Sequence, residues 1–208
     1  MDHIAYLRQF PKALNGPVVD ISKRFISNHV LTSSEEFEGP VIAKANLNCA
    51  GVKEARFAAR GLMPKDHAEP FTDYQIFESP AEVPVEYWRD RNIVVEKFLP
   101  ERDGDEFCLR TWVFFGDKET NSLSYANEPI IKSSKVVRRV SIPDEVPDAL
   151  RARREELGFD YGKFDYAVVD GEVVLYDANR TPSLGAFSRE KYMPTIELLA
   201  SGLEGFFQ

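Results

Sequence analysis

The stretch that decides the fold is Phe164-Asp165-Tyr166-Ala167-Val168-Val169-Asp170-Gly171-Glu172-Val173-Val174-Leu175-Tyr176-Asp177-Ala178-Asn179. Two apolar runs flank Asp170-Gly171, a pattern that predicts a β-hairpin. Asp165 lies at the open end of the first strand, and Asp177 and Asn179 share one face of the second. Mg²⁺ binds a few carboxylate or carbonyl oxygens and completes its shell with water and phosphates. The hairpin therefore predicts a magnesium site in a protein that uses a nucleotide.

The register of this hairpin decides whether the three side chains can meet. A two-residue turn at Asp170-Gly171 pairs Asp165 with Tyr176 and places Asp165 on the face opposite Asp177. A three-residue loop with Gly171 in a left-handed bulge shifts the pairing by one residue and brings all three side chains to one face. The metal hypothesis requires the three-residue loop. The alternative is a hairpin whose acidic residues only cap its strand ends.

Composition limits the function classes. The 208 residues are 43% hydrophobic and 29% charged, a globular balance, and the net charge of -8 argues against a broad basic surface for nucleic acid. Two distant cysteines, Cys49 and Cys108, indicate a reduced, cytoplasmic protein. We see neither a basic-then-apolar leader nor an apolar run approaching ~18 residues, so the sequence indicates neither secretion nor a membrane.

Patterns along the chain predict an α+β protein with two lobes. Residues 1–35 form an N-terminal segment with a lead-in helix over 21–31, residues 36–99 a small lobe, and residues 100–208 a large lobe. A polar, glycine-containing hinge over 100–105 separates the lobes. Apolar runs predict strands over 41–45, 74–78, 92–99, 106–115 and within 122–142. Further helices are expected over 53–62, 84–90 and 148–158 and within 193–202.

Charged residues inside two of these strands are candidates for ligand binding. Lys44 interrupts an apolar strand, where a buried lysine needs an anion such as phosphate, unless its stem reaches the sheet edge. Glu96 to Pro100 ends another strand, whose free backbone groups could pair with a purine edge or merely link two domains. Glu106 and Arg110 share one face of their strand. They suit ribose and phosphate, or an ordinary ion pair on a solvated face.

Taken in order, four blocks resemble the ATP-grasp superfamily, which includes D-alanine–D-alanine ligases, glutathione synthetases and glutamate ligases. The blocks are Gly39-Pro-Val-Ile-Ala-Lys44, Val94-Val-Glu-Lys-Phe-Leu-Pro100, Glu106-Phe-Cys-Leu-Arg110, and Phe164-Asp165 to Asp177-Ala-Asn179-Arg-Thr-Pro182. Each block is weak alone, and their order and spacing are specific. The resemblance covers nearly the whole chain and implies two lobes with antiparallel sheets that enclose a nucleotide cleft.

The resemblance also implies roles for single residues. Lys44 would hold the α- and β-phosphates, with Lys23 a second lysine before the small lobe. Glu96, Lys97 and Leu99 would form the adenine hinge, and Glu106 would bind the ribose. Asp165, Asp177 and Asn179 would bind Mg²⁺. Lys163 would lie beside the acyl phosphate. Independently of the resemblance, the place of Arg110 two pairs along the strand from Glu106 predicts that it reaches phosphate or an anionic transition state.

Two features depart from the family pattern. The family usually carries an N-terminal domain, yet almost nothing precedes Asn15 here. Either the chain is truncated, or a homodimer mate or other partner supplies the part of the substrate site that this domain usually forms, or the substrate binds differently. The loop from Asn46 to Gly51 has one glycine where the family's phosphate flap usually has several, which questions the mobility of the flap.

The resulting hypothesis is an ATP- and Mg²⁺-dependent ligase that joins a small-molecule carboxylate to an amine through an acyl phosphate. The chemistry then needs positioning and charge stabilisation more than a nucleophilic side chain. Two alternatives stay open at this point. One is a non-catalytic ATP-binding regulatory or scaffold protein, and the other is an ATP-grasp kinase that releases a phosphorylated product.

Overall fold

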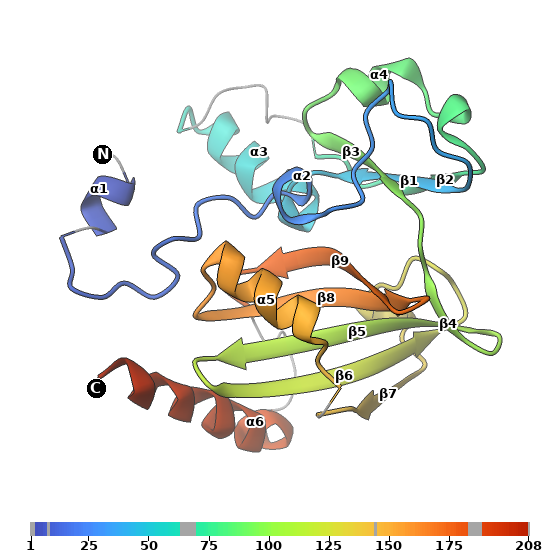
Figure 1. Cartoon of the computed structure of the whole chain (residues 1–208). Coiled ribbons are helices and arrows are strands. Elements are labelled where there is room, and N and C mark those ends of the chain that lie inside the picture. The colour runs from blue at the N-terminus through green and yellow to red at the C-terminus, as the bar shows by residue number, and fades with distance from the viewer. Residues whose placement is uncertain (1–2, 8, 63–69, 144, 183–188, 208) are drawn as a thin grey trace. The chain divides into compact units, whose positions relative to one another are not determined.

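The chain forms two units, each built around its own antiparallel sheet (Figure 1). The computed structural model describes residues 3–7, 9–62, 70–143, 145–182 and 189–207. Unit 1 comprises Met1–Asp20 with Glu101–Gln208, and unit 2 comprises Ile21–Pro100. The predicted α+β class is confirmed. The sequence placed residues 1–35 in one N-terminal segment, whereas the structure divides that segment between the two units.

Asn15 explains why the first residues belong to unit 1. Its backbone N–H donates to Oδ2 of Asp160 at 2.7 Å, and its Oδ1 accepts from the backbone N–H groups of Asp160 and Tyr161. Arg180 adds a bond to the carbonyl of Val18 at 3.0 Å. These bonds fix the N-terminal segment to the start of one long strand and the end of the next. The segment also contains a short helix, α1 (His3–Leu7), which lies outside the helix expected over 21–31.

Unit 2 holds a small sheet with the strand order β2-β1-β3. Its elements are α2 (Lys23–Ile26), β1 (Val41–Ala45), η1 (Asn48–Gly51), α3 (Val52–Ala59), β2 (Gln75–Phe77), η3 (Pro80–Glu82), α4 (Val85–Arg89) and β3 (Ile93–Lys97). The helix expected over 21–31 ends at Ile26, because the chain turns extended at Ser27 and Val30 then bridges to Glu96 of β3.

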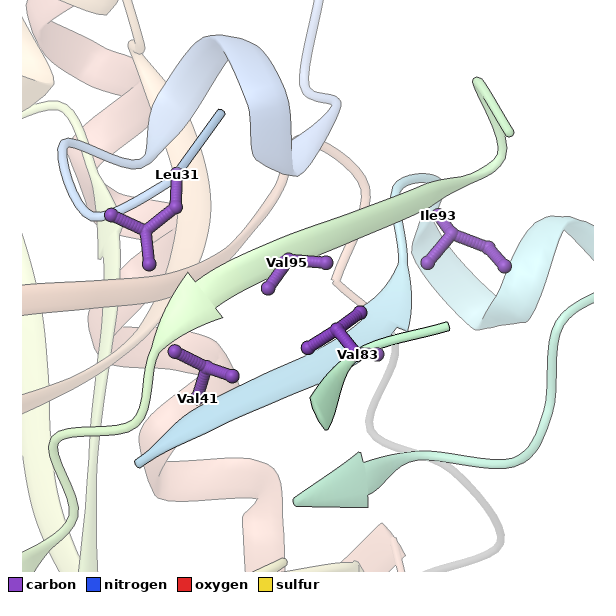
Figure 2. Packing of buried hydrophobic residues seen from close by; sticks show 6 residues of the cluster. Leu31, Val41, Val83, Ile93 and Val95 are labelled. Carbon is purple, nitrogen blue, oxygen red and sulfur yellow. The ribbon is translucent and has the colours of Figure 1, made fainter. Parts of the chain in front are cut away.

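The core of unit 2 lies on one side of β1 and β3 (Figure 2). Its buried members are Leu31, Val41, Ala43, Val83, Ile93 and Val95, and partly buried aromatic rings pack against them. All five residues of β1 are buried, so its two faces are both covered. A charged side chain on this strand therefore loses its contact with water and needs a partner.

Unit 1 holds the larger sheet, with the strand order β7-β6-β5-β8-β9 and β4 beside β5. Its elements are β4 (Glu101–Asp103), β5 (Glu106–Phe115), β6 (Lys118–Ala126), η4 (Ser133–Lys135), β7 (Arg138–Ser141), α5 (Asp148–Leu157), β8 (Tyr161–Val169), β9 (Glu172–Asn179), α6 (Arg189–Ser201) and η5 (Gly202–Phe206). The region expected to be a hinge, 100–105, contains the boundary between the two units at Pro100 and Glu101. The residues after Pro100 form a hairpin, in which Gly104 turns the chain with φ +61°.

The two faces of this sheet carry different residues. The Trp112 face bears Trp112, Phe114 and Phe164, all fully buried, and the helix α5 lies across it (Figure 1). Arg154 of α5 stacks over the Phe114 ring at 4.1 Å. The Thr111 face bears the alternate residues of β5 and their direct partners on β8, and Phe206 of η5 packs on it against Phe115. This division decides which functional side chains can meet.

The C-terminal helix α6 contacts β5 and β6. We expected a helix within 193–202 with Pro194 in its first turn, whereas α6 begins at Arg189 and has Pro194 inside it. None of the helices in the described ranges combines the length and the apolar character needed to cross a membrane.

Glu119 attaches α5 to the sheet. Its two carboxylate oxygens accept from Arg151 of α5 at 2.5 and 2.6 Å, and Oε2 also accepts from the indole N–H of Trp112 at 3.1 Å. The hydrogen bonds from Arg151 lower the pKa of Glu119 despite partial burial. A lowered folded-state pKa contributes stability above the unfolded pKa, and this stability is lost as pH falls through the folded value.

Glu119→Gln is therefore expected to destabilise the protein by about 1–3 kcal/mol at pH 7 and by much less at pH 3. The measurement is urea unfolding at both pH values. Glu156→Gln is the control, since the Glu156–Arg153 pair is 2.6 Å long but Glu156 is 67% exposed. An equal loss for both variants, or a Glu119→Gln loss that is the same at both pH values, contradicts this account.

Candidate functional site

The hairpin of β8 and β9 places Asp165 directly opposite Asp177. Val169 pairs with Glu172, so the connection is a two-residue turn at Asp170 and Gly171, with φ +52° and +83°. Positive φ at both positions is the geometry of a type I′ turn, which Asp-Gly favours. The predicted hairpin and its turn residues are therefore confirmed. The three-residue loop that the metal hypothesis required is wrong.

A β-bulge further along the hairpin provides the shift instead. The regular register continues to Tyr166 opposite Leu175, and the next pair is Asp165 opposite Asp177. Tyr176 is thus the extra residue of β9. An inserted residue moves each later side chain of its strand to the opposite face of the sheet. The bulge therefore brings Asp177 to the face of Asp165. Asn179 pairs with Lys163 on that same face.

Asp165 is held by two donors of the Thr111 face. Thr111 donates its hydroxyl to Oδ1 at 2.9 Å, and the Lys163 ammonium lies 2.6 Å from Oδ2. The Asp165 side chain is 15% exposed and that of Lys163 is 31% exposed. Burial raises the pKa of Asp165, the positive charge of Lys163 opposes this shift, and the negative charge of Asp177 adds to it. Thr111 is a site residue that the sequence did not reveal, because only the register of β5 and β8 identifies it.

The residues predicted to bind metal therefore line one face of one hairpin: two carboxylates and an amide, with Lys163 beside them. Oxygen donors of this type suit Mg²⁺, which takes few protein ligands. Within the described ranges no group of three or more His, Cys, Asp or Glu side chains could hold a metal. Any metal here would depend on Asp165 and Asp177 together with amide, water or phosphate oxygens.

Arg110 does not belong to this group. It lies on the Trp112 face, where its guanidinium binds both oxygens of Glu101 at 2.8–3.0 Å and Glu145 at 3.1 Å. Glu101 also accepts from the backbone N–H of Val168 at 2.9 Å. Arg110 was predicted to reach phosphate or an anionic transition state. Strand alternation from Thr111 points its side chain to the face opposite the predicted metal ligands. Its second acid, Glu145, is distant in sequence, and no local pattern indicated it.

Glu106, predicted to bind ribose, also lies on the Trp112 face, at the start of β5. Its Oε2 accepts from Arg138 at 2.7 Å, and the Arg138 guanidinium stacks over the Tyr125 ring at 3.2 Å. The Glu106 side chain remains 31% exposed. The carboxylate is therefore accessible, with one oxygen already engaged.

In unit 2, Lys44 forms a buried ion pair with Glu96. The Lys44 ammonium lies 2.7 Å from Oε2 of Glu96, and the two side chains are 6% and 2% exposed. Oε1 of Glu96 is buried and has no hydrogen-bond partner in the part of the chain that the structure describes. The pair places a lysine and a carboxylate with spare acceptor capacity next to each other on β1 and β3. The sequence singled out both residues but did not predict their contact.

The loop after Lys44 adopts a strained conformation. Cys49, Ala50 and Gly51 all have positive φ, at +51°, +58° and +76°. Left-handed non-glycine residues cost about 1 kcal/mol each and occur at functional sites. Lys23, which is 4% exposed, reaches this loop and donates to Oδ1 of Asn48 at 3.3 Å. The predicted phosphate loop and the predicted second lysine are therefore in contact.

Some backbone N–H groups of the predicted adenine hinge already donate hydrogen bonds within the protein. The backbone N–H of Lys97 donates to the carbonyl of His29 at 3.0 Å, and the N–H of Phe98 donates to Pro40 at 2.9 Å. Lys97 places its ammonium 5.1 Å from the Phe37 ring centroid. The N–H of Lys97 is thus unavailable to a purine in this state. Leu99 lies two residues beyond Lys97, the last residue of β3.

The Lys44–Glu96 pair gives a stability prediction. Lys44→Met leaves Glu96 buried without its cation and is expected to destabilise the protein by about 3–5 kcal/mol. Adding Glu96→Leu should recover most of that loss, since an apolar pair is often as stable as a buried ion pair. Urea unfolding measures both. Lys118→Met is the control, because the Lys118–Asp117 pair is exposed. If the double variant is as unstable as Lys44→Met alone, the loss does not come from leaving Glu96 buried without its cation.

The turn of the hairpin gives a second prediction. Gly171→Ala is expected to cost about 1–2 kcal/mol, because an L-residue is strained at φ +83° although the space around it is open. Gly205→Ala is the control, since that glycine is also surrounded by open space and has no positive φ. Thermal unfolding of both variants compares them. Equal stabilities for the two alanine variants would contradict a left-handed backbone conformation at Gly171.

Solved structures provide the comparisons. The chain is similar to D-alanine–D-alanine ligase from Bacillus anthracis, with 13% identity, a TM-score of 0.49, and coverage of 97% of this chain and 72% of that chain. It is similar to the ATP-grasp ligase PsnB, solved with a phosphomimetic variant of a minimal precursor, Mg and ADP, with 13% identity, a TM-score of 0.47, and coverage of 79% and 47%.

A third similar structure is the Chryseobacterium gregarium RiPP-associated ATP-grasp ligase with ADP and a leader and core peptide, at 12% identity, a TM-score of 0.45, and coverage of 78% and 48%. The chain spans about half the length of these last two proteins. No protein-family model and no curated protein matches the chain. Two of these three structures carry the name ATP-grasp ligase.

Proposed function

We propose that this protein is an ATP- and Mg²⁺-dependent ligase that joins a small-molecule carboxylate to an amine. The observation that carries the proposal is the direct pairing of Asp165 with Asp177 on a face that also bears Lys163 and Asn179. Two partly buried carboxylates facing each other repel, and a fold that retains them has a use for a cation between them. A strand-cap role does not need the bulge that brings them together.

The donor set fits Mg²⁺. Asp165, Asp177 and Asn179 would hold the ion, and the rest of its shell would come from water and nucleotide phosphates. When bound, Mg²⁺ would supply charge neutralisation at the phosphates of ATP. Thr111 would keep Asp165 in its rotamer through the 2.9 Å hydrogen bond to Oδ1.

Unit 2, taken by itself, also carries residues that suit a nucleotide. Lys44 and Lys23 are buried lysines of the kind that bind phosphates, and Lys23 touches the strained loop at Asn48. Oε1 of Glu96 could accept a hydrogen bond from an exocyclic amino group of a purine. The backbone beyond Lys97, including Leu99, would complete the purine contact.

The reaction proceeds in two balanced steps. A carboxylate oxygen of the substrate attacks the γ-phosphorus of ATP, forming an acyl phosphate as the bond to the leaving ADP breaks. The amine then attacks the acyl carbon, phosphate leaves with the electron pair of the broken C–O bond, and the nitrogen loses a proton. The Lys163 ammonium would stabilise the negative charge of these steps. No covalent enzyme intermediate is required.

One observation favours a second candidate, a nucleotide-binding protein without ligase activity. Arg110, the expected partner of Lys163 in catalysis, is bound to Glu101 and Glu145 on the other face. Lys163 is then the one predicted catalytic residue beside Asp165. Such a protein would bind Mg-ATP and form no ADP with any carboxylate. A kinase would release a stable phosphorylated product instead of a ligated one.

The test is ADP release with Mg-ATP against a panel of carboxylic acids and amines. Asp177→Asn is expected to lower the rate by more than about 100-fold, because even residues behind a metal ligand often contribute 10- to 100-fold. Asp170→Asn, an acid-to-amide change in the same hairpin, should leave the rate unchanged, since asparagine tolerates the left-handed turn.

Three results oppose parts of this proposal. Mg-ATP binding without ADP formation from any substrate pair supports the binding protein instead of the ligase. ADP formation that leaves a phosphorylated product supports the kinase. Equal rates for Asp177→Asn and Asp170→Asn remove the metal role of Asp177.

A further inference from the structure

Lys163 is the internal counter-charge of the candidate metal site. It precedes Asp165 by two residues on β8, so both side chains share the Thr111 face, and Nζ lies 2.6 Å from Oδ2. Among the residues whose charges act on Asp165, Asp177 disfavours the ionised carboxylate and Lys163 favours it. The hairpin thus carries two carboxylates and one ammonium, with one net negative charge on a partly buried surface.

The ammonium occupies the place that a metal ion needs. Thr111 takes Oδ1 of Asp165 and Lys163 takes Oδ2, so this chain's own donors engage both oxygens. A divalent cation and an ammonium bound to the same carboxylate oxygen repel each other strongly at partly buried sites. The Lys163 side chain is 31% exposed, and its flexible stem gives it room to leave.

We propose that Lys163 is an exchangeable counter-cation: it pairs with Asp165 in the metal-free protein and leaves when a divalent cation binds. This inference rests on the proposed function. Its consequence is a regulated order of events, because the Lys163 ammonium becomes available to the anionic substrate only after the metal has bound. The site also changes from one net negative to one net positive charge, which favours a carboxylate entering second.

The first test measures Mn²⁺ affinity without nucleotide, by electron paramagnetic resonance of free Mn²⁺. If Lys163 occupies Asp165 about nine-tenths of the time, Lys163→Met should bind Mn²⁺ about tenfold more tightly than the wild type. Lys118→Met is the matched control, since Lys118 forms a similar 2.8 Å pair with Asp117 elsewhere in unit 1. It should leave the affinity unchanged.

The second test uses the wild-type protein, since loss of a positive charge alone also favours a cation. An amine-reactive reagent is applied at constant pH with and without Mg²⁺, and labelled lysines are quantified by mass spectrometry. Labelling of Lys163 should rise several-fold with Mg²⁺, as its ion pair with Asp165 is released, and labelling of Lys118 should stay constant.

The outcomes separate this inference from the proposed function. Tighter Mn²⁺ binding by Lys163→Met together with Mg²⁺-dependent labelling supports the exchange. Mn²⁺ binding that Lys163→Met leaves unchanged or weakens overturns the exchange and leaves the metal site standing. Unchanged Lys163 labelling in the presence of bound Mg²⁺ overturns it as well. Absence of Mn²⁺ binding to the wild type and to both variants without nucleotide overturns the exchange, and its absence also in the presence of ADP overturns the metal-dependent function.

Discussion

One extra residue in β9 determines the chemistry available to unit 1. Without the bulge at Tyr176, the type I′ turn would direct Asp165 and Asp177 to opposite faces of the sheet. With it, both carboxylates lie on the Thr111 face, together with Lys163 and Asn179. The bulge costs a regular pairing in the sheet, and such irregularities commonly re-aim side chains next to active sites. The site is thus built on two long strands and positioned by a local defect.

Both units hold charges at places where burial makes them costly. Lys44 and Glu96 pair in the small sheet, and Lys163 and Asp165 pair in the large one. Buried ion pairs add little net stability, because desolvation offsets their attraction, so their presence needs another explanation. The proposed function offers the same explanation for both pairs. In unit 2, Glu96 would hold Lys44 in place for a phosphate, and in unit 1, Lys163 would hold Asp165 in place for a metal ion.

Local patterns were sufficient to predict the elements but not their irregularities. The strands Val41–Ala45 and Glu106–Phe115 follow from apolar runs and from alternation, and Asp170-Gly171 specified its own turn. The bulge at Tyr176 leaves no mark in the sequence, since either register satisfies the apolar pattern around it. The boundary between the units falls inside the predicted hinge, but the hairpin at Gly104 was not predicted, because its short strands are polar. Partners such as Glu145 for Arg110 depend on contacts between distant segments, which local patterns do not encode.

The proposed function requires that Asp165 and Asp177 together bind one divalent cation with a nucleotide. The most direct measurement is anomalous diffraction from crystals grown with Mn²⁺ and ADP, which locates the ion without reference to activity. This account predicts an anomalous peak within bonding distance of carboxylate oxygens of both residues. Bound ADP with a peak that lies away from the β8–β9 hairpin, or with no peak at all, would contradict it.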